Sequence, residues 1–379
     1  MKITGFDLFR FKLPLLRPFP GKTGAVPTRE GLILRLTLPN GSVGLGEISP
    51  LPGLSTESLK EAQKQVLFLK SKILNQTPPL HCDQFDGSLE RWLKPYHLFP
   101  SVVFGLESAI FNLLAEGKRA PLHRLLGSPS GTPIPLIGLL QGHPEAIVKE
   151  TQRLYREGVR TFKLKVGHRD IQEDFAKIQK IKEAVKGWAT LRLDANQAWS
   201  FQEAVDFANA LPKDFIEYIE EPFKDPSPKK MRDFFRATGI PVALDESLIK
   251  MKPEELAPTE GLKAVILKPT LLGGLEKTLR FIKQAKKSGI TPVISSSFET
   301  GVGLSTLAHL AYCNDGLPAG LDTLKWFRHD LVRKRKRIRL KKGKLSIPPG
   351  PLRMEDLNWK FFTRGKPPAF GGGLAHDRP

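Results

Sequence analysis

The chain has 379 residues, 40% of them hydrophobic, and its 59 Lys and Arg against 39 Asp and Glu give a formal net charge of +20. This apolar content is sufficient for a large core and excludes global disorder. The two cysteines, Cys82 and Cys313, are too few for a disulfide framework and lack the paired spacing of a zinc site. No apolar run approaches the roughly 18 residues that a membrane span needs, and the first residues show no signal-peptide pattern. We therefore expect a cytoplasmic protein of two or three domains, or one large barrel with an attached unit.

Much of the positive charge lies in one segment, residues 333–344, which holds nine basic residues and no acidic one. The segment also has the pattern of a β-hairpin, because residues 337–340 alternate in polarity and Lys342-Gly343 favours a turn. A charge this high is typical of proteins that bind nucleic acid or anionic membranes. However, the segment contains no aromatic residue on which a base could stack. We favour a solvated, charged edge strand and expect no nucleic-acid partner.

Residues 1–128 have the pattern of a compact α+β unit. Strand-like runs at residues 3–11 and 32–37 flank a Pro- and Gly-rich segment, 17–31, which predicts a loop. Apolar residues spaced by three and four between 59 and 73 predict an amphipathic helix. A second helix is expected over residues 101–116, with Ser101 as its N-cap.

From about residue 129, short apolar strands alternate with amphipathic, Lys-rich helices. The expected strands cover residues 134–140, 161–166, 190–194, 216–220, 241–245, 264–268, 291–295 and 319–324. Repeated βα units predict a parallel sheet, and eight strands predict a closed barrel. An open doubly wound sheet is the alternative, but such a sheet usually carries a Gly-rich nucleotide loop after its first strand, and no such loop is present here.

Ionisable residues stand at the C-terminal ends of five successive expected strands. They are Lys165, Asp194, Glu220, Asp245 and Lys268, at intervals of 29, 26, 25 and 23 residues. Active sites of such barrels are built at this end of the strands.

Strand alternation adds three residues to this set, since Lys163 shares a face with Lys165, and Arg192 and Asn196 share a face with Asp194. If these faces point inward, three carboxylates converge between two lysine-bearing walls. Such crowding is costly unless the charge is compensated, and all-oxygen ligands favour Mg²⁺ or Mn²⁺ over zinc. Glu221 and Glu246 alternate outward and are expected to form structural pairs.

These motifs resemble the enolase superfamily, in its muconate-lactonising-enzyme-like subgroup, and within it the o-succinylbenzoate synthase family. The motifs shared with the subgroup are KxK at 163–165, DAN at 194–196, EEP at 220–222, DES at 245–247 and LKP at 267–269. Residues 44–53 (GLGEISPLPG), 295–304 (SSSFETGVGL) and 320–323 (GLDT) resemble the synthases themselves.

The resemblance implies an α/β fold, a (β/α)₇β TIM-like barrel with an α+β capping domain. On this basis, residues 1–128 would form the capping domain, with 17–31 as a lid over the substrate, and 129–330 the barrel. Residues 331–362 would form a C-terminal hairpin that returns to the capping domain, and 363–379 a flexible tail.

The resemblance also implies the roles of the site residues. Asp194, Glu220 and Asp245 would bind Mg²⁺, with Mn²⁺ as a possible substitute. Lys165 would be the acid/base, Lys268 the cation on the opposite face, and Lys163 a further member of the catalytic group. Arg192, Asn196, Ser296 and Ser297 would contact a small dicarboxylate substrate.

The implied reaction is a dehydration in menaquinone biosynthesis that yields o-succinylbenzoate. The nearest alternative is racemisation of N-succinylamino acids, or epimerisation of N-acylamino acids or dipeptides, on the same site. Dipeptide epimerases tend to carry an Asp-x-Asp on the last strand, whereas Gly320-Leu321-Asp322 supplies one Asp. A nucleic-acid-binding protein and a catalytically inactive scaffold are further alternatives, and the complete set of ionisable residues disfavours the second.

Overall fold

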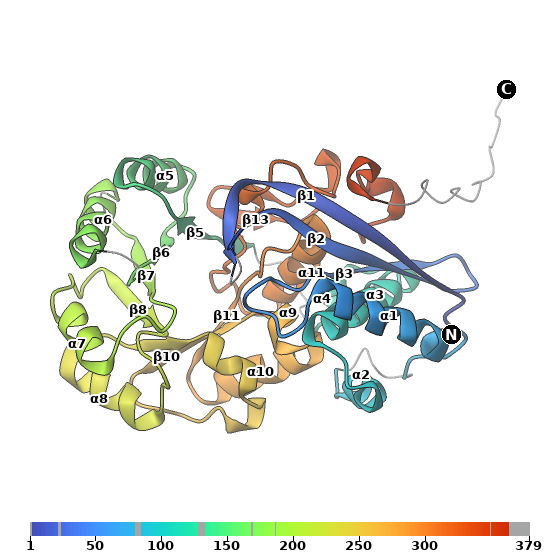
Figure 1. The fold of residues 1–379 in the computed structure, drawn as a ribbon, viewed down its shortest axis with the longest axis horizontal. Helices are drawn as coiled ribbons and strands as arrows, with labels where there is room; N and C mark the ends of the chain where they lie inside the picture. The colour runs from blue at the N-terminus through green and yellow to red at the C-terminus, as the bar shows by residue number, and fades with distance from the viewer. Residues whose placement is uncertain are drawn as a thin grey trace.

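The computed structural model describes residues 2–21, 24–79, 85–127, 133–167, 170–185, 187–348 and 350–363. Within these ranges the chain forms an antiparallel sheet in the order β1-β2-β3, a seven-stranded parallel sheet from β11 to β5, and a small sheet in the order β12-β13-β4. Figure 1 shows the long β1–β2 ribbon extending from the N-terminal helices toward the parallel strands. None of the described helices is both long and apolar enough to cross a membrane.

The N-terminal part packs helices on a three-stranded sheet. Its strands are β1 (Gly5–Gly21), β2 (Gly24–Thr37) and β3 (Val43–Ile48), and its helices are α1 (Leu59–Ile73), α2 (Ser88–Leu93), α3 (Pro100–Gly117) and α4 (Leu122–Leu125). The predicted first helix is confirmed, with Ser58 as its N-cap in a capping box with Glu61. The predicted cap of the second helix is wrong, because Phe99 occupies the cap position, Pro100 begins the helix and Ser101 is buried.

The loop predicted for residues 17–31 is also wrong where the structure describes it. β1 and β2 instead continue as one antiparallel hairpin in which Phe19 pairs with Val26, with a register shift between Pro14 and Phe19. β1 is the edge of its sheet, since β2 is its one neighbour in the sheet order and its other side carries two isolated bridges, at Phe11 and Leu15. At a position without such a bridge, a proline costs no hydrogen bond to a second strand.

The glycines of β3 allow α3 to lie directly against the sheet. A Cβ on Gly46 would collide with the carbonyl of Gly105, and a Cβ on Gly44 with that of Ala109. This close approach gives the glycine pattern of residues 44–46 a structural reason and fixes the segment that follows, residues 47–53, beside the barrel.

The parallel strands confirm most of the predicted βα units. They are β5 (Ile137–Leu140), β6 (Thr161–Lys165), β7 (Thr190–Asp194), β8 (Ile216–Glu220), β9 (Val242–Leu244), β10 (Leu262–Leu267) and β11 (Thr291–Ile294). The flanking helices are α5 (Pro144–Arg156), α6 (Ile171–Ala184), α7 (Phe201–Asn209), α8 (Pro228–Thr238), α9 (Pro269–Leu272), α10 (Leu275–Lys287) and α11 (Gly301–Tyr312). The fold is an α/β TIM-like barrel with a capping unit.

The eighth predicted strand, residues 319–324, is shorter than expected. Ala319 bridges Leu136 and Gly320 bridges Ser295, both in parallel, and a 3-10 helix follows at Leu324–Trp326. These two bridges connect the first and last strands of the seven-stranded sheet and so close the ring. Inside it, Ile137, Tyr218, Ala243, Ala264, Ile266 and Val293 form a buried cluster.

The predicted basic hairpin is confirmed as β12 (Arg339–Lys341) and β13 (Lys344–Ser346). β13 pairs with β4 (Ile134–Pro135), which immediately precedes β5, so the hairpin lies at the amino ends of the barrel strands. The chain then returns to the N-terminal sheet, where Phe362 bridges Phe11. The predicted domain boundaries remain predictions, and the expected flexible tail lies outside the described residues from 364 onward.

Candidate active site

A pocket of about 150 Å³ lies at the carboxyl ends of the parallel strands. Seven residues predicted for the site line it: Lys163, Lys165, Asp194, Asn196, Lys268, Ser296 and Ser297. β6 and β10 are separated by three strands in the sheet order, so Lys165 and Lys268 approach the pocket from opposite sides of the ring.

Three carboxylates and two lysines form a cluster of ion pairs at this pocket. Asp194, Lys163 and Lys268 line the pocket itself, whereas Glu220 and Asp245 are in contact with these lysines but are not lining residues. Lys163 Nζ lies 3.0 Å from Asp194 Oδ2 and also contacts Glu220, while Lys268 Nζ contacts Asp245 Oδ2. Glu220 pairs with Asp194 across β7 and β8, which places both at one level of the barrel. The side chains of all three carboxylates are almost completely buried.

This crowding changes how the acidic groups titrate. Burial opposes ionisation of Asp194, but the nearby Lys163, Lys165 and Lys268 hold its pKa at about 2. Burial is the main cause that raises the pKa of Glu220, to about 7. The positive charge of Lys163 lowers this pKa, but the negative charges of Asp194 and Asp245 act against Lys163. Burial disfavours the charged form of Lys163 and of Lys268, yet the adjoining carboxylates raise the pKa of both.

The donor set is suited to a hard divalent cation. Asp194 and Glu220 contact the same ammonium group, and Asp245 follows β9, the strand next to β8, so three carboxylates lie at the ends of adjacent strands and supply only oxygen ligands. In the part of the chain that the structure describes, no three His, Cys, Asp or Glu side chains are already spaced to hold a metal ion. The ammonium groups of Lys163 and Lys268 instead contact the carboxylate oxygens.

Lys165 has a different environment from Lys163. Its ammonium donates to Asn196 Oδ1 at 2.9 Å, and Asn196 in turn donates to Glu246 Oε1 at 2.7 Å. Glu246 lines the pocket, so the expectation that it points outward is wrong. Glu221, in contrast, forms the expected structural contacts, since it accepts the backbone N–H groups of Asp245 and Ser247.

The two predicted serines lie on the wall formed after β11. Ser296 Oγ is 2.6 Å from Thr323 Oγ1. The Ser297 hydroxyl is buried and has no hydrogen-bond partner among the described residues. This hydroxyl can therefore bind a ligand without breaking an existing hydrogen bond.

Arg192 is not brought to the pocket wall. Its guanidinium lies inside the barrel, 4.9 Å from the centre of the Tyr218 ring, and donates to Glu217 at 2.8 and 3.1 Å. A contact between Arg192 and a substrate in the pocket would need this pair to open.

Several lining residues are not among the predicted site residues, and the capping part supplies five of them. Leu15, Arg17 and Pro18 come from β1, and Leu51 and Leu54 follow β3. The resemblance at 44–53 pointed to Leu51. The lid expected at 17–31 pointed to Arg17 and Pro18, although as part of a loop and not of a strand.

A buried network fastens the capping part to the wall that carries the serines. Arg29 on β2 donates to the carbonyls of Phe298 at 2.9 Å and Pro50 at 2.6 Å, and also contacts that of Ser49. Glu47 accepts the backbone N–H of Thr300 and of Gly303 at the start of α11, both at 2.9 Å. These contacts fix the 296–298 wall relative to the capping sheet.

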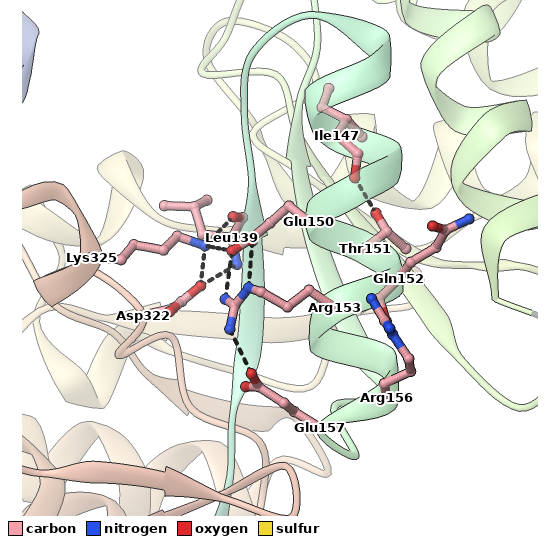
Figure 2. A network of polar contacts seen from close by, with 10 residues as sticks. All are labelled: Leu139, Ile147, Glu150, Thr151, Gln152, Arg153, Arg156, Glu157, Asp322 and Lys325. Atoms are coloured by element: carbon pink, nitrogen blue, oxygen red, sulfur yellow. Dashed lines mark hydrogen bonds and ion pairs between the residues drawn. The ribbon is translucent and has the colours of Figure 1, made fainter.

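Asp322, the single acidic residue of the closing segment, is already engaged. Figure 2 shows its carboxylate beside Lys325, and it also accepts the Leu139 N–H at 3.1 Å. Lys325 further contacts Glu150 at 3.1 Å. The charge of Asp322 is thereby balanced within the protein.

The comparisons with known proteins agree with this architecture. The family model described as "Enolase C-terminal domain-like" matches residues 146–351 and defines an enolase-type barrel. The model described as "MenC, N-terminal domain" matches residues 3–113.

Two curated relatives extend the match over most of the chain. The o-succinylbenzoate synthase of Pasteurella multocida is 33% identical over 339 residues, which cover 87% of this chain and 92% of the relative. Protein PHYLLO, chloroplastic, of Arabidopsis thaliana is 31% identical over 350 residues, which cover 80% of this chain but only 20% of that longer protein. The chain therefore belongs to the enolase superfamily and, within it, to the o-succinylbenzoate synthase family.

Solved structures show the same fold. The substrate-liganded L-Ala-D/L-Glu epimerase from Bacillus subtilis aligns with a TM-score of 0.80 at 25% identity, covering 93% of this chain and 98% of that one. A member of the enolase superfamily from Roseovarius nubinhibens, complexed with magnesium, aligns with a TM-score of 0.81 at 20% identity, covering 96% and 98%.

Proposed function

We propose that the chain is a Mg²⁺-dependent lyase that dehydrates 2-succinyl-6-hydroxy-2,4-cyclohexadiene-1-carboxylate to o-succinylbenzoate in menaquinone biosynthesis. The observation that carries this proposal is the placement of Lys165 and Lys268 on opposite sides of one pocket, beside a cluster of three carboxylates of which Asp194 lines the pocket. The o-succinylbenzoate synthase relatives support the choice of reaction.

The difficult step of this reaction is removal of a proton next to a carboxylate, which leaves two negative charges on the substrate. When bound, Mg²⁺ would be held by Asp194, Glu220 and Asp245 and would stabilise the charge on that carboxylate. Lysine bases with Mg²⁺ are a known pattern of the enolase superfamily. Lys163 and Lys268 contact one oxygen of each of these carboxylates, so the second oxygen of each could bind the cation.

Lys165 is the proposed base, because Asn196 holds its ammonium nitrogen at the pocket surface. After it has taken the proton, the same group can protonate the departing hydroxide, so both bonds break on one face of the ring. Lys268 remains cationic, in line with its raised pKa, and stabilises the intermediate from the other face.

Two features of the wall suit a succinyl-bearing dianion. The free hydroxyl of Ser297 offers a hydrogen bond to a substrate carboxylate. Arg17 brings a positive charge from β1 to the same pocket. We propose these two residues as contacts for the succinyl carboxylate.

A racemase is the second candidate, since two lysines on opposite faces can also exchange one proton on a chiral carbon. The B. subtilis epimerase neighbour favours this reaction class. Asp322 disfavours the dipeptide version, because an amine ligand would have to compete with Lys325 for its carboxylate. Racemisation of N-succinylamino acids, which lack a free amine, is the version that the pocket allows.

The proposal is tested by mixing purified protein, Mg²⁺ and the cyclohexadiene substrate and following the absorbance of the aromatic product. Turnover that stops on chelation of the metal and resumes on its return is the expected result. Absence of product formation with Mg²⁺ present would refute the dehydration.

A further inference from the structure

A second cavity, of about 950 Å³, lies apart from the catalytic pocket and shares no lining residue with it. Four segments distant in sequence form its walls: the turn between β2 and β3, residues 116–124 from the end of α3 into α4, the C-terminal half of α11, and residues 347–348 and 350–353 after β13. Its size is within the usual range of small-molecule sites.

The cavity carries uncompensated positive charge. Of its lining residues, Arg119, Arg124 and Arg353 are cationic and Glu116 is the one carboxylate. Arg353 pairs with Glu116 at 3.0 Å. The guanidinium groups of Arg119 and Arg124 have no hydrogen-bond or ion-pair partner among the residues that the structure describes, and both side chains are exposed. Two guanidinium groups are thus available to a ligand.

Aromatic rings form the wall beside these arginines. The His123 ring stacks on that of His309 at 5.3 Å and lies 5.0 Å from the ring of Tyr312. The Nδ1 atoms of the two histidines are 3.1 Å apart, so one must donate a proton and the other accept it. This contact requires at least one neutral imidazole, and burial lowers the pKa of both histidines, so the positive charge of the cavity comes from the arginines.

We propose that this cavity binds a small polyanion, an organic phosphate or a polycarboxylate, through Arg119 and Arg124. The planar guanidinium matches two oxygens of a phosphate or carboxylate at once. A concave site holds the anion partly away from water, where each charge pair is stronger than on an open surface. The site is independent of the catalytic assignment.

The test is calorimetric titration of the full-length protein with inorganic pyrophosphate and, separately, with citrate, in Mg²⁺-free buffer at about 150 mM salt. We expect saturable binding of at least one anion at one site per chain. The Arg119→Gln/Arg124→Gln double variant should bind at least about tenfold more weakly, because it removes both guanidinium groups that are proposed to contact the anion.

The matched control is Arg339→Gln/Lys341→Gln, which removes two exposed charges from β12 outside the cavity. It should change the affinity less than about twofold if the anion binds in the cavity. Equal losses in both double variants would show attraction to the net charge alone. Such equal losses would overturn the proposal. So would the absence of saturable binding for both anions, or an unchanged affinity in the Arg119/Arg124 variant. Stronger binding of pyrophosphate indicates an organic phosphate as the natural ligand, and stronger binding of citrate a polycarboxylate.

Discussion

Lys163 and Lys165 stand two residues apart on β6, yet their surroundings separate their roles. Lys163 contacts two buried carboxylates, which raise its pKa. Lys165 contacts the neutral amide of Asn196. A side chain bonded to two anions is poorly placed to take a proton, so we assign the base to Lys165 and a charge-balancing role to Lys163.

The substitution Lys165→Ala should lower kcat by about 10²–10⁴-fold, the usual contribution of a general acid–base group. Mg²⁺ binding should persist, because Lys165 contacts none of the three proposed ligands. Steady-state rates and calorimetric Mg²⁺ titration measure the two effects. Lys182→Ala, which removes a lysine paired with Asp214 on the barrel surface, is the control. Retained activity in Lys165→Ala would mean that another group is the base.

The substitution Arg29→Leu should destabilise the fold by about 3–5 kcal/mol, because it leaves several buried polar groups unpaired. Arg29 binds carbonyls on both the capping part and the barrel wall. Arg35→Leu on the same strand removes a half-exposed pair with Asp7 and should cost less than about 1 kcal/mol. Urea denaturation measures both changes. Similar losses in the two variants would contradict a fastening role for Arg29.

At the level of secondary structure, a buried acid joins the capping helix α3 to the barrel helix α10. Glu107 accepts the backbone N–H groups of Leu275 and Glu276 at the start of α10. Burial and the neighbouring Glu276 raise its pKa to about 8. Between the usual carboxyl pKa and about 8, the unfolded state therefore binds fewer protons at this site than the folded state.

The contribution of Glu107 to the free energy of unfolding should therefore fall as pH rises from about 4.5 to about 8. Glu107→Gln keeps an acceptor for the two N–H groups but cannot ionise, so it should flatten this decline. Unfolding measured at pH 5 and pH 8 for both proteins tests the prediction. An equally steep loss in the variant would place the titrating group elsewhere.

The sequence predicted the barrel strands well because their apolar runs and spacing are local signals. It failed at residues 17–31 because Pro18 and Pro20 indicate a loop, whereas an edge strand tolerates them. The predicted length of the closing strand was too great. Residues 319–324 have the composition of a strand, but only Ala319 and Gly320 form bridges to neighbouring strands.

The candidate site was predictable only in part. The residues that meet at the strand ends could be predicted, because each βα unit carries an ionisable residue at the same position, the C-terminal end of its strand. Contacts such as Glu47 with Thr300, more than 250 positions apart, depend on how the capping sheet docks and leave no local pattern. The orientation of Glu246 was missed because it lies beyond the end of β9, in a 3-10 helix where strand alternation no longer applies.

At the scale of the whole molecule, the basic hairpin and the proposed catalytic pocket lie at opposite ends of the barrel. The basic hairpin lies at the amino ends of the strands, where Leu136 donates to the Gly343 carbonyl at 2.9 Å, and the catalytic pocket lies at their carboxyl ends. Arg339, Lys341 and Lys344 are exposed, as expected for a charged edge. The net charge can attract a dianionic substrate, which affects the association rate more than the chemistry.

Mg²⁺ should stabilise the folded protein, since a ligand that binds only the folded state raises its stability by about 2.7 kcal/mol at one hundred times its dissociation constant. Thermal unfolding with increasing Mg²⁺ should show a rising Tm. Glu220→Gln, which removes one proposed ligand, should abolish most of the rise. A Tm that does not depend on Mg²⁺ in the unmodified protein would contradict the metal site.

The most direct test of the account compares two reactions of one protein preparation with Mg²⁺ present. The values of kcat/KM are measured for dehydration of the cyclohexadiene substrate and for racemisation of N-succinylamino acids, with Lys165→Ala alongside. We predict that dehydration is the faster reaction and that the variant loses it. Rapid racemisation without formation of o-succinylbenzoate would contradict the central claim.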